Sequence, residues 1–168
     1  MANLAFIGLG SNLQDPSSQL QRAITVINEL PNTSILGRSS MYRSAPLDCV
    51  KQPGLVNPDF INAVIKIETT LSPQSLLQAL LDIEYQHGRK RTFRNAPRTL
   101  DLDVLLYNDI KMHEHGLTIP HPQMHMRAFV LHPLLEISPE TIIPGLGSAR
   151  LALDNCRDQV LERIIDAF

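Results

Sequence analysis

Residues 60–68 read Phe-Ile-Asn-Ala-Val-Ile-Lys-Ile-Glu, and this run decides the fold that the sequence predicts. Side chains alternate between the two faces of a strand. One face of this run would carry Ile61, Ala63, Ile65 and Ile67. The opposite face would carry Phe60, Asn62, Val64 and Lys66. The pattern predicts a strand with one apolar face on the core.

The segments before this strand alternate between strand and helix signals. A short apolar run over 4–9 predicts a first strand. Asp15 followed by Pro16 is typical of a helix start, with Asp as the N-cap and proline at the first helical position. That helix would end at Pro31, and a second strand would run from Ser34 to Tyr42. The irregular, proline-rich stretch 44–59 predicts a long loop, which in a compact domain is usually functional or mobile.

The segments after it complete the pattern. Ser72 and Pro73 predict a second helix start, and Gly88 stands where a C-cap glycine belongs. A fourth strand is predicted over 99–107. The order β-α-β-β-α-β is the ferredoxin-like arrangement, so we expect an α+β fold with a mostly antiparallel sheet and helices packed on it. A segment over 124–135 and a C-terminal helix over about 151–168 would extend this core, the helix burying a stripe of Val160, Leu161, Ile164 and Ile165.

Composition limits the kind of protein. The 168 residues are 43% apolar and 19% charged, which predicts one folded domain spanning residues 1–168. A net charge of −2 gives no global field for nucleic acid. Only two cysteines occur, Cys49 and Cys156, and they form no CxxC motif. The start resembles a strand and not a signal peptide, and no run is long enough to span a membrane. We therefore expect a cytoplasmic protein.

Asp101 and Asp103 carry the sharpest chemical signal. They lie on one face of the predicted strand over 99–107, and strand geometry sets them roughly 6.5–7 Å apart. Two carboxylates at this spacing repel each other unless a cation lies between them. Magnesium prefers such oxygen ligands together with substrate phosphates. The alternative is a solvated outer face that tolerates two aspartates.

A basic loop precedes this strand. Residues 86–99 contain five cations and no acid, namely Arg89, Lys90, Arg91, Arg94 and Arg98. The planar guanidinium suits phosphate oxygens, so the loop could deliver charge to a metal-held polyphosphate. A solvated charge run is the alternative. Adjacency favours the first interpretation, because Arg98 lies three residues before Asp101.

Glu84 is an anomaly on the second predicted helix. On a helical wheel it falls inside the apolar stripe of Leu76, Leu77, Leu80 and Leu81. A buried carboxylate is costly unless it is paired or metal-bound. A glutamate that reaches water at the helix end, or pairs with Arg89, is the alternative.

Five histidines occur in a short segment, namely His113, His115, His121, His125 and His132. Zinc is a weak interpretation, because Pro122 interrupts the helix that would align His121 with His125 and no HExxH motif occurs. No P-loop motif occurs either, and Gly8-Leu9-Gly10 lacks the third glycine of a dinucleotide site. Asn62 beside Phe60 could bind a flat heterocycle or serve as a structural amide.

The sequence resembles the 6-hydroxymethyl-7,8-dihydropterin pyrophosphokinase family of folate biosynthesis over residues 5–144. The resemblance runs through Gly-Ser-Asn-Leu at 10–13, Tyr-Arg-Ser-Ala-Pro-Leu at 42–47 and Asn-Pro-Asp-Phe-Ile-Asn-Ala-Val at 57–64. Its most specific segment is Arg-Asn-Ala-Pro-Arg-Thr-Leu-Asp-Leu-Asp-Val-Leu-Leu at 94–106. Leu-Thr-Ile-Pro-His-Pro at 117–122 and Arg-Ala-Phe-Val-Leu at 127–131 complete it.

The resemblance implies transfer of pyrophosphate from ATP to the pterin hydroxymethyl group, with release of AMP. It implies that two Mg2+ ions are held by Asp101 and Asp103, and that the catalytic arginines are Arg89 and Arg98. It implies a pterin site made of Ser44, Ala45, Leu47, Phe60, Asn62 and Phe129. It implies an ATP site made of Glu84, Arg91, Arg94, Thr118, His121 and Arg127. The expected partners are the two small molecules, without nucleic acid or membrane, and the expected state is a monomer.

Three positions depart from the family pattern, and two other functions remain open. Asn95, Gly116 and Leu81 stand where some relatives carry a tryptophan, a basic residue and a polar residue. They bear on how the lid seals and how tightly ATP binds. A two-metal nucleotidyltransferase would release free pyrophosphate in place of AMP. An RNA-binding ferredoxin-like module would need surface aromatics, which three Tyr, five Phe and no Trp supply poorly.

Overall fold

The fold is seen in a computed structural model that describes residues 2–12, 15–44, 60–87 and 100–164. Its first half contains β1 (Asn3–Ser11), α1 (Pro16–Asn28), β2 (Thr33–Arg38), β3 (Met41–Ser44), β4 (Phe60–Thr69), α2 (Pro73–Gln86) and β5 (Asp101–Tyr107). Its second half contains β6 (Met112–Glu114), β7 (Leu117–Ile119), the 3-10 helix η1 (Met124–Met126), α3 (Ala128–Ile137), β8 (Ile142–Ile143), β9 (Gly147–Ser148), α4 (Ala149–Asp154) and β10 (Leu161–Ile164).

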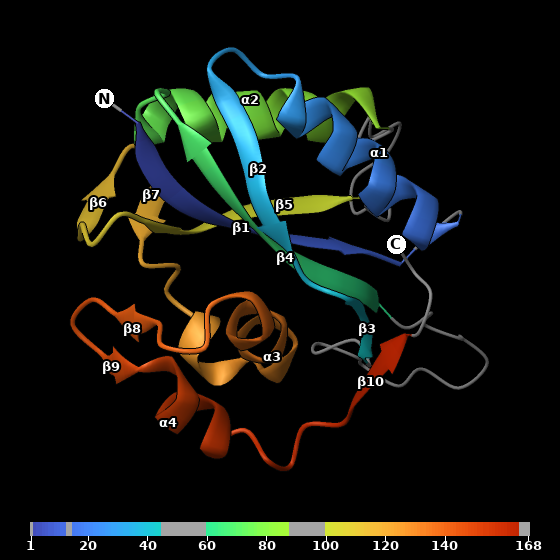
Figure 1. Cartoon of the computed structure of the whole chain (residues 1–168), viewed down its shortest axis with the longest axis vertical. Helices are drawn as coiled ribbons and strands as arrows, with labels where there is room; N and C mark the ends of the chain where they lie inside the picture. The colour runs from blue at the N-terminus through green and yellow to red at the C-terminus, as the bar shows by residue number, and fades with distance from the viewer. Residues whose placement is uncertain (1, 13–14, 45–59, 88–99, 165–168) are drawn as a thin grey trace.

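One antiparallel sheet organises the molecule. Its strands follow the order β10-β3-β4-β1-β5, and β2 also pairs with β4. Helices α1 and α2 lie together on one face of the sheet, and α3 with α4 lies on the other (Figure 1). This arrangement confirms the predicted ferredoxin-like order.

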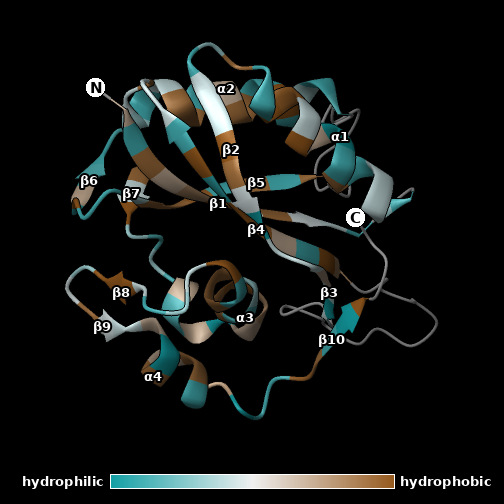
Figure 2. Cartoon of the chain, in the orientation of Figure 1, coloured by the Kyte–Doolittle hydropathy of each residue, from teal (hydrophilic) through white to brown (hydrophobic). Residues whose placement is uncertain are grey.

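Each face of the sheet has its own apolar core. Hydrophobic residues are found in the strands and in the helices on both sides of the sheet (Figure 2). The face toward α1 and α2 carries Ile61, Ala63, Ile65 and Ile67, as the alternation predicts. Val64 belongs to the second cluster, under α3. Because β4 is central and covered on both sides, most of its side chains are buried, and it holds the two layers together.

A β-bulge between β1 and β5 changes which face of the sheet the side chains of β5 point to. Phe6 pairs with Leu106 and Ile7 with Val104, so Leu105 is the extra residue. Leu105 and Leu106 consequently both pack in the cluster under α3. On that face β5 is acidic where it begins and apolar where it ends.

The predicted helix starts are confirmed, although they differ in detail. Ser72 accepts a hydrogen bond from the backbone N–H of Ser75 at 3.2 Å, as an N-cap does. Asp15 also occupies the N-cap of α1, but its side chain makes no capping bond and accepts instead from the Ser18 hydroxyl at 2.8 Å. Gly88, the expected C-cap of α2, lies outside the described residues.

The single strand predicted over 34–42 is wrong, because the chain forms two strands there. It breaks at Ser39 and Ser40, between β2 and β3. The Ser39 hydroxyl accepts from Val64 N–H at 2.9 Å, and its own N–H donates to Val64 C=O at 2.9 Å. The Ser39 hydroxyl thus replaces the backbone acceptor that a continuous strand would offer to Val64 N–H. The chain then continues into β3, which also pairs with β4.

The predicted C-terminal helix over 151–168 is also wrong in its described part, residues 151–164; Ile165 lies outside the described residues. Helix α4 ends at Asp154, and Leu161–Ile164 forms β10, which pairs with β3 in the register of Leu161 with Ser44. The unpaired edge of β3 offers backbone hydrogen bonds that a short isolated helix cannot match. Val160, expected in a buried stripe, is 87% exposed.

Within the described ranges, the longest apolar helix falls short of what a membrane crossing requires.

Candidate active site

The two aspartates lie at the start of β5, on the sheet face shared with α3. Leu100, Leu102 and Val104 point the other way, into the core under α1 and α2, as the alternation predicts. Asp101 is half-buried and Asp103 is exposed.

Two glycines of β1 leave the strand beside the aspartates without side chains. Gly10 lies opposite Asp101 and Gly8 opposite Asp103. On its other side, Gly10 lies opposite Asn62 of β4. Two strand spacings separate Asn62 from Asp101, roughly 10 Å across the bare backbone of β1. The sequence analysis did not predict that these glycines keep β1 bare beside the aspartates, although two glycines two residues apart in a strand were the signal for it.

Asn62 is buried and held in one orientation. It is 3% exposed, and its Nδ2 donates to the Ser44 hydroxyl of β3 at 2.7 Å. A Cβ added to Gly10 would lie 3.1 Å from Asn62 Oδ1 and 4.0 Å from a ring carbon of Phe60. The residues expected to bind a heterocycle therefore lie together next to the bare part of β1.

The segment before α3 adds a histidine and an arginine. Burial lowers the pKa of His121, and the charge of Arg127 lowers it further, whereas the Asp103 carboxylate raises it. The balance keeps His121 neutral at pH 7, when its ring can both donate and accept. His121 thus interacts electrostatically both with Arg127 of its own segment and with Asp103 of β5, at one end of the site.

Arg127 is held by two neighbours. Its guanidinium lies over the Phe129 ring at 5.5 Å and donates to the Gln123 side chain. Gln123 is a positioning residue that sequence reasoning missed, because its i−4 relation to Arg127 has meaning only once the loop between β7 and α3 is folded. Phe129, expected on the pterin, and Arg127, expected on the nucleotide, are thus in direct contact.

Glu84 is buried in α2, as its place in the apolar stripe predicts. It is 3% exposed, and its Oε2 accepts from Leu102 N–H at 2.7 Å. Leu102 is the residue between the two aspartates, so this bond fixes the part of β5 that carries them. The buried stripe is rotated slightly from the predicted one, because it contains Ile83 while Leu81 is 41% exposed.

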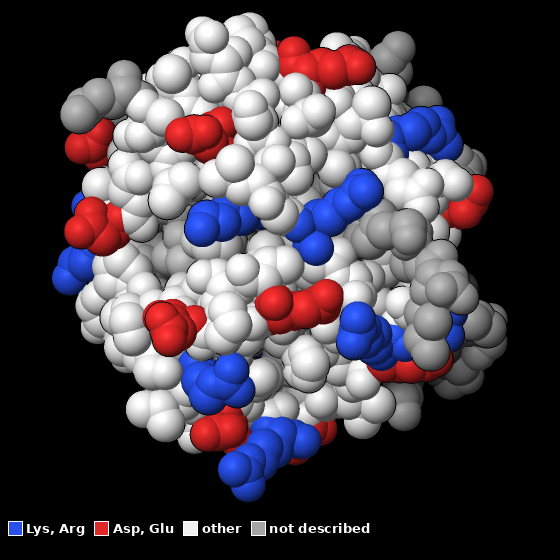
Figure 3. Space-filling model, in the orientation of Figure 1, with Lys and Arg blue, Asp and Glu red and all other residues white. Residues whose placement is uncertain are grey.

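Thr118 lies on the β6–β7 hairpin. Its hydroxyl contacts His113 Nδ1 at 2.7 Å across the hairpin. Ala45, Leu47, Arg89, Arg91, Arg94 and Arg98 lie outside the described residues, as do Lys90 and Asn95. On the face seen in Figure 3, charges of both signs are interspersed among the described residues, consistent with the absence of a global basic field.

The donor atoms suit a hard cation better than zinc. No group of three His, Cys, Asp or Glu side chains able to hold a metal occurs among the residues that the structure describes. Two carboxylates on one strand supply oxygen ligands only, and Mg2+ commonly completes such a set with phosphate oxygens and water. The aspartates thus fit Mg2+ that arrives with a phosphate substrate.

The chain is similar to known proteins. Residues 6–139 match the family model of 7,8-dihydro-6-hydroxymethylpterin-pyrophosphokinase (HPPK). A 2-amino-4-hydroxy-6-hydroxymethyldihydropteridine pyrophosphokinase of Haemophilus influenzae is 48% identical over 141 residues, covering 84% of this chain and 85% of the relative. The protein of that name from Pseudomonas aeruginosa is 38% identical, with 98% of each chain covered.

Solved structures show the same fold. A Plasmodium falciparum HPPK-DHPS crystal structure superposes with a TM-score of 0.72 at 17% identity, over 92% of this chain. The chain spans 44% of that longer protein.

The fold and the sequence relatives together define an ATP-dependent pyrophosphokinase of folate biosynthesis. The chain belongs to the 7,8-dihydro-6-hydroxymethylpterin-pyrophosphokinase family.

Proposed function

We propose that this chain carries out its family's reaction on the sheet face that joins Asn62 to Asp101 and Asp103. The reaction moves the terminal diphosphoryl group of ATP to the hydroxymethyl group of 6-hydroxymethyl-7,8-dihydropterin and releases AMP. The observation that carries the proposal is the row of Asn62, Gly10 and Asp101, in which a residue without a side chain lies between the buried amide and the first of two carboxylates.

The pterin would lie on the Asn62 end of this row. The Ser44 hydroxyl accepts from the Asn62 Nδ2 and so orients the amide. The Asn62 Oδ1 can then accept from donors on the edge of the ring. Phe60 and Phe129 would supply aromatic faces, with Ala45 and Leu47 completing the pocket. Fixed donors and acceptors favour a ring with the complementary edge, because a mismatched partner leaves buried polar groups unpaired.

The nucleotide would lie on the aspartate end. Two Mg2+ ions held by Asp101 and Asp103 would neutralise the phosphate charge and orient the transferred group. Glu84 fixes this strand through Leu102, while Thr118, His121 and Arg127 would line the nucleotide. Arg91 and Arg94 would add positive charge from the basic loop.

Positioning of the substrates and neutralisation of charge would provide the rate acceleration, since phosphoryl transfer requires little covalent catalysis from the protein. Arg89 and Arg98 would stabilise the charge that develops on the transferred group, so Arg98→Ala should lower kcat more than it raises KM. We further propose that the protein acts as a monomer in the cytoplasm.

The test pairs the aspartates with a neighbouring control. Asp101→Asn and Asp103→Asn should each lower AMP formation from ATP, Mg2+ and the reduced pterin alcohol by at least about 100-fold. Asp109→Asn, in the exposed turn after β5, should leave the rate within about twofold. Calorimetric titration with Mg2+ and a nonhydrolysable ATP analogue gives a second readout, in which both site variants should lose binding.

Wild-type turnover in either site variant would refute the metal assignment. Release of free pyrophosphate in place of AMP would identify a nucleotidyltransferase.

A further inference from the structure

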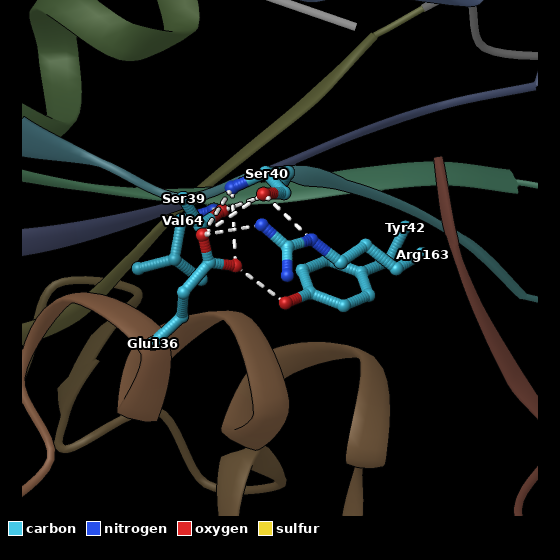
Figure 4. A network of polar contacts seen from close by, with 6 residues as sticks. All are labelled: Ser39, Ser40, Tyr42, Val64, Glu136 and Arg163. Carbon is cyan, nitrogen blue, oxygen red and sulfur yellow. Dashed lines mark hydrogen bonds and ion pairs between the residues drawn. The ribbon is translucent and has the colours of Figure 1, made fainter. Parts of the chain in front are cut away.

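Glu136, near the end of α3, gathers several hydrogen bonds away from the proposed site (Figure 4). Its two carboxylate oxygens accept from Ser40 N–H at 3.1 and 3.0 Å, and one also accepts from the Ser40 hydroxyl at 2.9 Å. The Tyr42 hydroxyl donates to the same carboxylate. Arg163 of β10 lies 3.9 Å from it. One side chain of α3 thus contacts both β3 and β10.

These bonds hold the joint at which the chain leaves β2 and enters β3. On the side facing β4, Ser39 is held by its two hydrogen bonds to Val64. On the other side, the Ser40 N–H points to Glu136, and Arg163 Nε donates to the Ser40 hydroxyl at 3.0 Å. The joint is therefore held from β4, from α3 and from β10 together.

Two routes connect this joint to the pterin-binding residues. Along β3, Tyr42 lies opposite Asn62, and Ser44, two residues further, accepts the Asn62 amide. Along α3, Phe129 and Glu136 are seven residues apart, which places them on nearly the same helix face. Between them, the His132 ring packs against Tyr42 at a centroid distance of 5.2 Å.

Removing the Glu136 carboxylate would loosen the contact between α3 and β3. Glu136 fastens α3 to β3, and these two elements carry Phe129 and Ser44 on the two sides of the proposed pterin pocket. If the carboxylate is removed, the Ser40 N–H and the Tyr42 hydroxyl lose their acceptor, and α3 can shift relative to β3. A hydrogen bond to a charged group is stronger than a neutral one, so a neutral replacement would hold the joint less well.

We propose that Glu136 is a positioning residue for the pterin, acting through Tyr42 and α3 on Asn62 and Phe129, with Arg163 as its counter-charge. This inference depends on the proposed function, because it assigns a positioning role within that same site. Glu136 acts mainly on the pterin end of the site, since the aspartates lie on β5 at the far side of β4 and β1 and only Arg127, at the N-cap of α3 and nine residues from Glu136, belongs to the nucleotide side.

The experiment compares steady-state constants for the two substrates. Glu136→Ala should raise KM for the pterin about tenfold while KM for ATP stays within about twofold. Tyr42→Phe, which keeps the ring and removes only the hydroxyl, should raise the pterin KM about threefold, and the double variant should be no worse than Glu136→Ala because both changes break one network. Glu136→Gln should recover part of the loss. Glu140→Ala, an exposed glutamate just after α3, is the matched control and should behave as wild type.

The outcomes separate a failure of the proposed function from a failure of the positioning role of Glu136. If wild type forms no AMP with the pterin, the proposed function fails. If wild type turns over but Glu136→Ala and Tyr42→Phe leave the pterin KM unchanged, or raise both KM values equally, the positioning role is overturned. If Glu136→Ala does not fold, Tyr42→Phe still supplies the KM comparison.

Discussion

Gly10→Ala offers the sharpest test of the bare strand between the two halves of the site. The new methyl would lie 3.1 Å from Asn62 Oδ1, closer than ordinary van der Waals contact. The amide cannot simply rotate away, because the Ser44 hydroxyl holds its nitrogen at 2.7 Å. The substitution should therefore displace the amide by a few tenths of an ångström and cover part of the row between Asn62 and Asp101.

The expected effect on stability is small. Alanine in a strand interior is favoured over glycine by about 0.5–1 kcal/mol, whereas forcing Asn62 off its rotamer costs about 0.5–1.5 kcal/mol. The two terms nearly cancel. For the pterin, two displaced hydrogen bonds of about 1 kcal/mol each give about 2 kcal/mol, or roughly thirtyfold in KM.

The assay measures pterin KM by AMP release and the unfolding free energy by urea titration. Gly37→Ala in β2 is the matched control, because its added Cβ would meet no atom within 4 Å. A Gly10→Ala enzyme with a wild-type pterin KM would refute the argument that this glycine keeps the binding face open.

Three further predictions concern single side chains. Glu84→Gln should lower the unfolding free energy by about 1–3 kcal/mol, measured by urea titration, because a neutral amide replaces the buried acceptor of Leu102 N–H; an unchanged midpoint would contradict this. Ser44→Ala should raise the pterin KM about fivefold without changing the ATP KM, since the Asn62 amide loses the partner that orients it. For Glu136, burial raises the pKa, but hydrogen bonds from Tyr42 and Ser40 outweigh it and hold the pKa below its usual 4.5. The carboxylate therefore stabilises the fold above about pH 4.5, and this contribution is lost as the pH falls through the lowered pKa; the stability gap between wild type and Glu136→Gln should narrow in acid, and a constant gap in urea titrations at neutral and acidic pH would contradict the assignment.

Local patterns predicted the elements whose environment is uniform. The alternation in residues 60–68 predicted β4 correctly, because a strand between two packed layers must present a consistent side-chain period to both. The stripe on α2 predicted that Glu84 is buried. It did not reveal the partner, since the Leu102 N–H lies on another element.

The two errors in secondary structure arise where a tertiary partner overrides local preference. Ser39 and Ser40 sit in an otherwise strand-like run, and only the hydrogen bonds to Val64 and Glu136 break it. Residues 161–164 have apolar side chains at a spacing that suits a helix. The free edge of β3 recruits them into a strand instead.

The sequence by itself determined the β-α-β-β-α-β order of the core, the facing of Asp101 and Asp103, and membership of the family, because these follow from local side-chain periods and motif spacing. The tertiary structure decided which distant residues meet: Gly10 beside Asn62, His121 beside Asp103, and Glu136 at the joint before β3. The physical reason is that hydrogen bonds and electrostatic interactions depend on distances in space, and those distances are fixed only when the sheet register and the helix packing are in place.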